Sequence, residues 1–225
     1  MGIRTPEGVV LAVEKRLTSP LLEASSVEKI FEVDSHVGFA ISGLAADART
    51  LVDHGRVECQ SHRFTYDEPL RVESLTQALC DLAMSFGEGS EEAESDKRAG
   101  ERKKVKMSRP FGVSLLLAGV DARGPQLYHM DPSGTFVAYA AHAIGAGAEG
   151  AVTQLVDKAA GGALSLDAAM ALVTRVLADT MEEKLTPTNF ELATVTAARG
   201  FRVHSAAELA PLIARAVAEA AADVA

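Results

Sequence analysis

The 225-residue chain has no long hydrophobic run and very little cysteine. Its longest apolar stretch, FGVSLLLAGV at 111–120, is far shorter than the roughly 20 residues that a membrane-spanning helix needs. The two cysteines, Cys59 and Cys80, form no CxxC motif and no cluster with histidine. We therefore expect two reduced thiols inside the core of a protein from a reducing compartment. The six histidines are scattered and lack the spacing of metal ligands.

A basic surface and targeting signals are missing as well. The chain has 22 Lys and Arg residues against 31 Asp and Glu residues, which gives a net charge of −9. Binding to the phosphates of a nucleic acid needs a basic surface instead. Met1 to Arg4 lead straight into a strand-like segment rather than a signal peptide, and Pro6 stands where a myristoylation motif needs Ser or Thr. The 48% hydrophobic and 24% charged residues are typical of a packed globule. We expect a chain that binds neither nucleic acid nor a membrane.

The apolar pattern predicts alternating groups of strands and helices over a single domain, residues 1–225. Strands are expected at 8–14, 29–34, 36–42, 111–121, 124–131, 134–144, 190–195 and 200–205. Helices are expected at about 45–64, 72–86, 148–160 and 166–184, and Ser165 is expected to be the N-cap of the helix at 166–184. A fifth, terminal helix is expected after a capping box formed by Ser205 and Glu208. Val57 and Val217 are expected on the buried sides of their helices. Hairpin-linked strands and paired helices together predict an α+β fold, a four-layer αββα sandwich of two antiparallel sheets flanked by helix pairs.

The segment 87–108, GEGSEEAESDKRAGERKKVKMS, interrupts this pattern. It is acidic first and basic afterwards, and it has no large apolar residue before Val105. Such a segment cannot offset the cost of ordering its backbone, roughly 1–2 kcal/mol per residue. We expect a charged, mobile loop within the domain.

The motif GAGAEG at 145–150 matches the dinucleotide fingerprint GxGxxG and lies between a predicted strand and a predicted helix. A second helix follows, however, so the motif lacks the βαβ unit that such sites require. A tight strand-to-helix turn is the simpler interpretation. The alternative interpretation is a nucleotide-binding enzyme, which would require measurable binding of a dinucleotide.

His129, Asp131 and Ser133 have the residue types of a hydrolase triad. Three members within five residues of a strand and turn cannot easily converge, because alternate strand residues face opposite ways. We interpret Asp131 to Gly134 as a turn.

Several long motifs together resemble one protein family, the alpha-type subunits of the proteasome core particle. They are the segments 8–30, 42–58, 109–121, 124–136 and 143–151, and the match runs from about Gly2 to about Leu212. The segment MEEKLTPTNFELATV at 181–195 is similar to the alpha-5 type of these subunits. The resemblance implies the sandwich of N-terminal-nucleophile hydrolases. It also implies about thirty further residues, a gating tail and a helix, before the start of this sequence, so the chain is expected to be N-terminally truncated.

The resemblance bears on catalysis. Beta-type relatives use an N-terminal threonine as nucleophile. Here the upstream part of the first strand, where that threonine lies, is absent, and Thr5 sits further along the strand. Glu14 stands where active relatives have an aspartate, and Lys29 stands where they have a catalytic lysine. We expect a non-peptidase subunit, the alternative being a beta-type threonine peptidase.

Lys29 then has another role that the resemblance implies. In alpha subunits this lysine lines a pocket between neighbours and pairs with the C-terminal carboxylate of an activator, and Gly43 and Leu44 match other pocket residues. The alternative is a solvated lysine at a strand edge.

The implied partners are neighbouring alpha subunits, beta-ring subunits, and C-termini of regulatory-particle ATPases or other activators. The implied role is ring assembly, substrate gating and tail docking in ubiquitin-dependent protein degradation, in cytoplasm and nucleus, with no cofactor and no metal.

Overall fold

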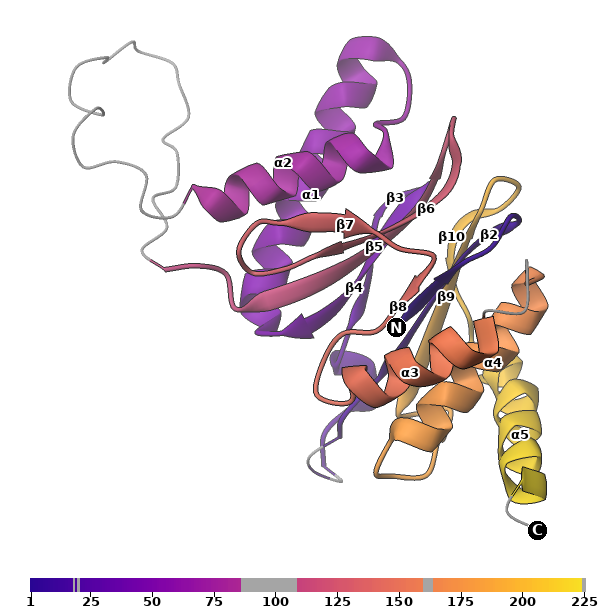
Figure 1. Cartoon of the computed structure of the whole chain (residues 1–225). Coiled ribbons are helices and arrows are strands. Elements are labelled where there is room, and N and C mark those ends of the chain that lie inside the picture. Colours follow the sequence, from indigo (N-terminus) through magenta and orange to yellow (C-terminus); the bar gives the residue numbers. More distant parts are fainter. Residues whose placement is uncertain (18, 20, 86–108, 160–163, 224–225) are drawn as a thin grey trace.

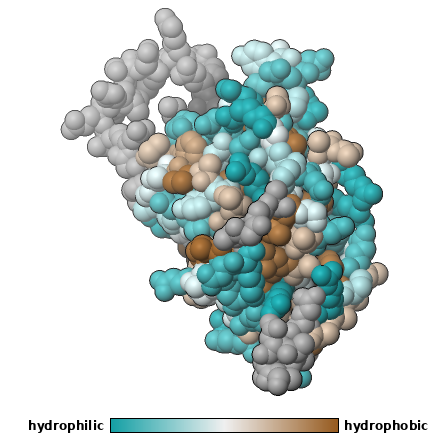
Figure 2. Space-filling model, turned by 45° about the vertical axis from the view of Figure 1, so that its right-hand side comes forward, coloured by the Kyte–Doolittle hydropathy of each residue, from teal (hydrophilic) through white to brown (hydrophobic). Residues whose placement is uncertain are grey.

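The computed structural model describes residues 1–17, 19, 21–85, 109–159 and 164–223 (Figure 1). The segment 87–108, expected to be a mobile loop, lies outside the described residues. Among those residues, no helix is both long enough and apolar enough to cross a membrane. Hydrophilic residues cover most of the face in Figure 2, and hydrophobic residues gather near its middle.

The first of two antiparallel sheets has the strand order β10-β9-β2-β1-β8. Its strands are β1 (Gly2–Arg4), β2 (Gly8–Glu14), β8 (Ala141–His142), β9 (Phe190–Thr196) and β10 (Gly200–Val203). The central strand β2 is buried on both faces, which explains its unbroken apolar sequence. Val9 and Leu11 face the other sheet, and Val10 and Ala12 face the helices.

The second sheet has the order β3-β4-β5-β6-β7. Its strands are β3 (Ile30–Asp34), β4 (Val37–Gly43), β5 (Val113–Asp121), β6 (Gly124–Met130) and β7 (Phe136–Ala138). The prediction of one strand at 134–144 is wrong, because β7 pairs with β6 whereas β8 pairs with β1 in the first sheet. The Tyr139 N–H still bonds to Leu127 O (2.9 Å), but the next carbonyl, Ala140 O, accepts from Arg4 N (2.7 Å). The chain therefore crosses between the sheets at this point.

Helices cover the outer face of each sheet, as predicted for the four-layer sandwich (Figure 1). The second sheet carries α1 (Ala45–Tyr66) and α2 (Val72–Met84). The first sheet carries α3 (Ala148–Ala159), α4 (Leu166–Thr180) and α5 (Ala206–Asp223). A short 3₁₀ turn, Ala24–Ser26, interrupts the connection from β2 to β3. A third apolar cluster fills the space between the sheets.

The helix caps follow the sequence predictions in part, and the cysteines follow them fully. Ser165 caps α4 by accepting a hydrogen bond from Ala168 N, as expected, but α4 ends at Thr180 rather than at 184. At the start of α5 only the glutamate half of the capping box forms, with the Glu208 carboxylate accepting from Ser205 N (2.9 Å). Both cysteines are free and buried, which confirms the core thiols, and burial raises the pKa of each to about 12.

Two predictions of buried side chains are wrong. Val57 on α1 is 51% exposed and Val217 on α5 is 52% exposed. Each lies off the stripe of its helix that faces the sheet: on α1 the buried positions include Gly55 and Cys59, two residues to either side of Val57. Two residues turn a helix by about 200°, so Val57 points away from the core.

Candidate functional site

Lys29 extends the edge strand of the second sheet by one residue. Its carbonyl accepts a hydrogen bond from Ile41 N (3.0 Å), which continues the β3–β4 pairing beyond Ile30. Gly43 ends the neighbouring strand β4, about 7 Å further along than Ile41, and Leu44 follows it as the N-cap of α1. The start of β3 and the end of β4 thus bring the three predicted site residues to the same end of the sheet.

The Lys29 ammonium is half-buried and links the two sheets. Its Nζ donates to Glu14 O (2.8 Å), at the last residue of β2 in the first sheet. Burial lowers the pKa of Lys29, and the nearby Arg16 charge lowers it further, whereas the Glu14 carboxylate raises it. An ammonium has three N–H donors and this bond uses one, so the group can still bind an anionic acceptor.

A partly buried ion pair supports the backbone at Lys29. Glu191 on β9 and Lys15 form it, with Oε1 and Nζ 3.2 Å apart and each side chain 12% exposed. The other carboxylate oxygen of Glu191 accepts a long hydrogen bond from Lys29 N (3.5 Å). Sequence reasoning missed Glu191, because 162 positions separate it from Lys29 and no local pattern connects them.

The Gly43–Leu44 turn has a backbone that only glycine fits. Gly43 has a φ of +124°, and a Cβ added there would lie 2.3 Å from Gly112 O. The same carbonyl accepts a hydrogen bond from Leu44 N (2.9 Å), the N-cap of α1. The Leu44 side chain is 53% exposed, so it offers apolar surface at this end of the sheet.

A second ion pair holds this turn against the start of β5. Both terminal nitrogens of Arg109 donate to the Asp47 carboxylate, at 2.7 and 2.9 Å, and Oδ2 of Asp47 also accepts from Gly112 N (2.9 Å). The Arg109 guanidinium and the Gly112 N–H lower the pKa of Asp47. Asp47 is buried in the first turn of α1. An acidic residue near a helix N-terminus was the available sequence signal, but its partner lies 62 positions away.

The glycine motif at 145–150 also lies beside this end of β4. Gly145 has a φ of +106°, and a Cβ there would lie 3.0 Å from the Ser42 hydroxyl oxygen. Its carbonyl accepts from Ala148 N (3.2 Å), which starts α3. The described elements around the motif include no βαβ unit, since β8 and α3 are followed by α4. The geometry agrees with a tight turn.

The residues His129, Asp131 and Ser133 do not form a triad. The Asp131 carboxylate accepts from Ser133 N (2.8 Å) and Thr135 N (3.2 Å), which makes it the centre of a turn, as predicted. His129 instead pairs with His142, their ring centroids 4.7 Å apart. Both line an open surface pocket of about 500 Å³ that Glu149 also borders. No three metal-ligating side chains converge there or elsewhere in the described part of the chain.

The histidine pair predicts a loss of stability in acid. Burial lowers the pKa of both imidazoles, and the charge of His129 lowers that of His142 further, whereas Asp131 raises that of His129. A folded-state pKa below the unfolded value of about 6.5 means that the unfolded chain takes up more protons as the pH falls through that range. The free energy of unfolding should therefore fall from pH 7.5 to 5.5. Thermal melts should show a smaller fall in stability over this pH range for the double variant His129→Gln/His142→Gln than for wild type. A fall of the same size in both proteins would contradict the role of the histidine pair.

Thr5 has a structural role. It follows β1, its hydroxyl donates to Gly8 O (3.0 Å) and accepts from Gly8 N (3.2 Å), and its side chain lies inside the β1–β2 turn. A hydroxyl engaged in this way stabilises the turn and is not presented to a substrate.

Comparison with known proteins agrees with this fold. A family model described as "Proteasome subunit" matches residues 1–91 and 102–195. The chain is 54% identical to the "Probable proteasome subunit alpha type-5" of Schizosaccharomyces pombe, over 96% of this chain and 83% of that protein. It is 51% identical to the alpha type-5 subunit of Dictyostelium discoideum, over 95% and 84%, and 52% identical to that of Drosophila melanogaster, over 93% and 82%.

The two antiparallel sheets between helix layers are the sandwich of N-terminal-nucleophile hydrolases, and the chain belongs to the proteasome subunit family. Within the family it is similar to alpha type-5 subunits along most of its length. It is an alpha-type subunit of the proteasome core, which assembles with other proteasome subunits, and not the peptidase. The alternative of a beta-type threonine peptidase is therefore wrong.

Proposed function

We propose that the chain serves in the outer alpha ring as a structural subunit that receives the C-terminal tails of regulatory-particle ATPases or other activators. In this role it supports ubiquitin-dependent protein degradation through ring assembly, substrate gating and tail docking. The observation that carries the proposal is the half-buried Lys29 ammonium at the same end of the sheet as the Gly43–Leu44 turn. We further propose a cytoplasmic and nuclear location, which the two free thiols suit.

The chemistry of the three residues suits a chain terminus. A terminal carboxylate bears a full charge, and a charge-assisted hydrogen bond to an ammonium is roughly twice as strong as a neutral one. Partial burial of the lysine reduces competition from water. Leu44 adds an exposed apolar side chain that can contact the residues before the carboxylate. Glu191 and Asp47 hold the two halves of the site in place through their ion pairs with Lys15 and Arg109.

The test is to label the assembled core particle with a short activator-tail peptide. A peptide that carries a photo-crosslinker near its C-terminus is expected to label this subunit close to Lys29 or Leu44. The same peptide with an amidated C-terminus should label it several-fold less, because the charge that pairs with the ammonium is gone. Equal labelling by both peptides, or labelling only of other subunits, would reject the proposed docking role.

A further inference from the structure

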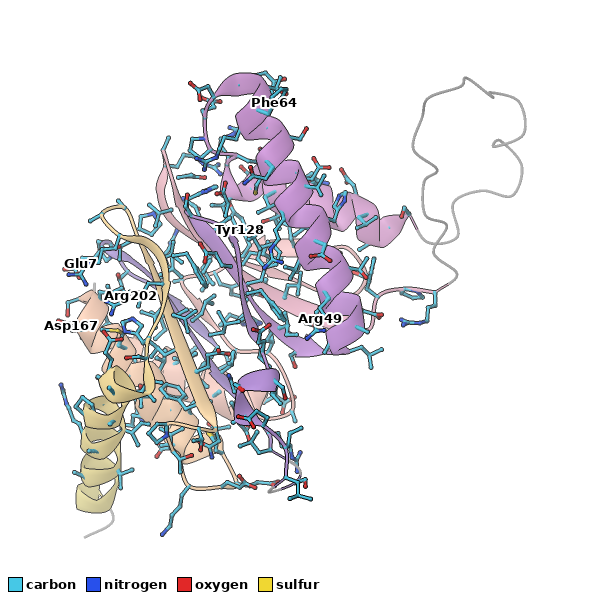
Figure 3. All side chains as sticks on the ribbon, turned by 180° about the vertical axis from the view of Figure 1, so that it is seen from behind. Glu7, Arg49, Phe64, Tyr128, Asp167 and Arg202 are labelled. Carbon is cyan, nitrogen blue, oxygen red and sulfur yellow. The ribbon has the colours of Figure 1, made fainter. Side chains whose placement is uncertain are left out.

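Two histidines from different sheets meet at one edge of the sandwich. His129 lies on β6, two residues after Leu127, whose side chain packs between the sheets. Because side chains alternate along a strand, His129 faces that same space, whereas Tyr128 points towards the α1 and α2 layer (Figure 3). His142 ends β8 of the other sheet, and its neighbour Ala141 packs towards the helices, so His142 also faces inward. The two imidazole rings have centroids 4.7 Å apart.

The rings are held in fixed places by regular structure. His129 is paired with Leu116 in the β5–β6 ladder, and His142 is paired with Gly2 in the β1–β8 ladder. The ring of Tyr139 stacks on that of His142, with centroids 4.1 Å apart and 17° between the ring planes. The pair is therefore formed before any ligand arrives, which lowers the entropy lost on binding.

The ring nitrogens of the pair are available to a ligand. Among the described residues, neither imidazole takes part in a hydrogen bond. Burial lowers the pKa of both histidines, so both rings are neutral at pH 7. A neutral imidazole keeps one nitrogen unprotonated, and the lone pair of that nitrogen is the commonest metal ligand in proteins.

The spacing of the two rings fits a single bound ion. A zinc ion lies about 2.0–2.1 Å from an imidazole nitrogen and therefore about 3.2 Å from the centroid of that ring. Two centroids 4.7 Å apart then subtend an angle of about 95° at the ion. This angle lies between those of octahedral and tetrahedral coordination, and zinc, with its filled d shell, has no electronic preference that excludes it.

The surroundings of the rings suit a hydrated cation. The open surface pocket of about 500 Å³ that they line leaves room for the ion and for water molecules. Glu149, at the start of α3 and beside β8 (Figure 1), borders the pocket, and the Asp131 carboxylate acts electrostatically on His129. Both carboxylates attract a positive ion. Imidazole ligands in turn favour zinc over magnesium or calcium, which prefer oxygen ligands.

We propose that His129 and His142 bind a zinc ion that joins the two sheets, with water molecules as the remaining ligands. Catalytic zinc sites have three protein ligands and structural zinc sites have four. A site with two protein ligands should therefore hold its ion reversibly. The bound ion stabilises the open edge between β6 and β8, and this role is independent of tail docking at Lys29.

The first test is calorimetric titration of the purified, chelator-treated chain with zinc chloride. We expect one zinc ion to bind per chain. His129→Gln and His142→Gln should each weaken the binding at least about tenfold, because loss of a residue that only supports a metal ligand already costs about 10- to 100-fold in affinity. Absence of binding to wild type, or wild-type affinity in either variant, would overturn the proposal.

His54→Gln is the matched control. His54 lies on α1, where its Nε2 is 3.7 Å from Oε1 of Glu58, so this pair offers zinc another histidine and a carboxylate. The variant should bind zinc as tightly as wild type does. Loss of binding in His54→Gln would place the ion on α1 instead and overturn the proposal.

Zinc should also stabilise the fold, because the two ligands come together only in the folded chain. At free zinc tenfold above Kd, the Tm of wild type should rise by about 3–6 °C. The Tm of the double variant His129→Gln/His142→Gln should not rise. An unchanged Tm in wild type, or the same rise in both proteins, would count against the site.

A measurement on the wild-type chain alone does not depend on how the variants fold. Diethyl pyrocarbonate acylates unprotonated imidazole nitrogens, and mass spectrometry measures the extent of reaction at each histidine. Zinc should slow the reaction several-fold at His129 and His142 and leave the rates at His54 and His62 unchanged. Equal rates at His129 and His142 with and without zinc would show that the ion does not bind there.

Discussion

Lys29→Ala is expected to weaken the binding of a carboxylate-terminated tail peptide at this subunit by about 2–4 kcal/mol, roughly 30- to 1,000-fold in Kd. The expected loss is large because the ammonium is half-buried and a carboxylate left without it would be desolvated and unpaired. The measurement is fluorescence anisotropy of a short labelled peptide on core particles that contain the variant. A single peptide is preferred to a whole activator, because an activator that binds several pockets at once would mask the loss of one.

Lys158→Ala on α3 is the matched control for this variant. It removes the same charge at a side chain that is 33% exposed and paired with Asp179 at 3.7 Å, and it should change the peptide affinity less than twofold. Lys29→Arg should bind the peptide better than Lys29→Ala but less tightly than wild type, because a planar guanidinium replaces a compact ammonium. Amidation of the peptide and Lys29→Ala should together cost less than the sum of their separate effects. Unchanged affinity in Lys29→Ala would mean that Lys29 is only a lysine at a strand edge.

Gly38→Ala is expected to destabilise the chain by about 1–3 kcal/mol, the usual cost of overpacking a core. Gly38 lies on β4, and a Cβ added there would come within 2.0 Å of the ring of Phe201, which belongs to β10 of the other sheet. The Phe201 backbone is fixed as well, since its N–H bonds to Ser35 O (2.7 Å). The ring must therefore move to make room for the added methyl group, which changes its packing between the sheets. Urea denaturation of the purified chain measures the change.

The same substitution at Gly150 provides the control. Gly150 lies in the first turns of α3, and a Cβ there would meet nothing within 4 Å. Because alanine is favoured over glycine in a helix by about 0.5–1 kcal/mol, Gly150→Ala should leave stability unchanged or raise it. In a Phe201→Ala background, Gly38→Ala should lose most of its cost. A Gly38→Ala chain as stable as wild type would show that the two sheets adjust freely at this point.

The sequence by itself determined the architecture of this protein. Short apolar runs of strand length in 8–14 and 36–42, and apolar residues at the helical period in 45–64, indicate which faces are buried. The order of strand hairpins and helix pairs then favoured a sandwich of two antiparallel sheets, because that arrangement buries those faces. The motifs that resemble proteasome alpha subunits pointed to the family and to Lys29, Gly43 and Leu44 as the candidate site.

Only the tertiary structure decided what surrounds those residues. Glu191 beside Lys29 and Arg109 on Asp47 are ion pairs between distant parts of the chain, and a local pattern carries no information about such pairs. The crossing between β7 and β8 depends on which strand each segment meets, not on its own apolar residues. Val57 illustrates the same limit: apolar spacing suggested the core, but the position of the sheet under α1 decided that this side chain faces outward.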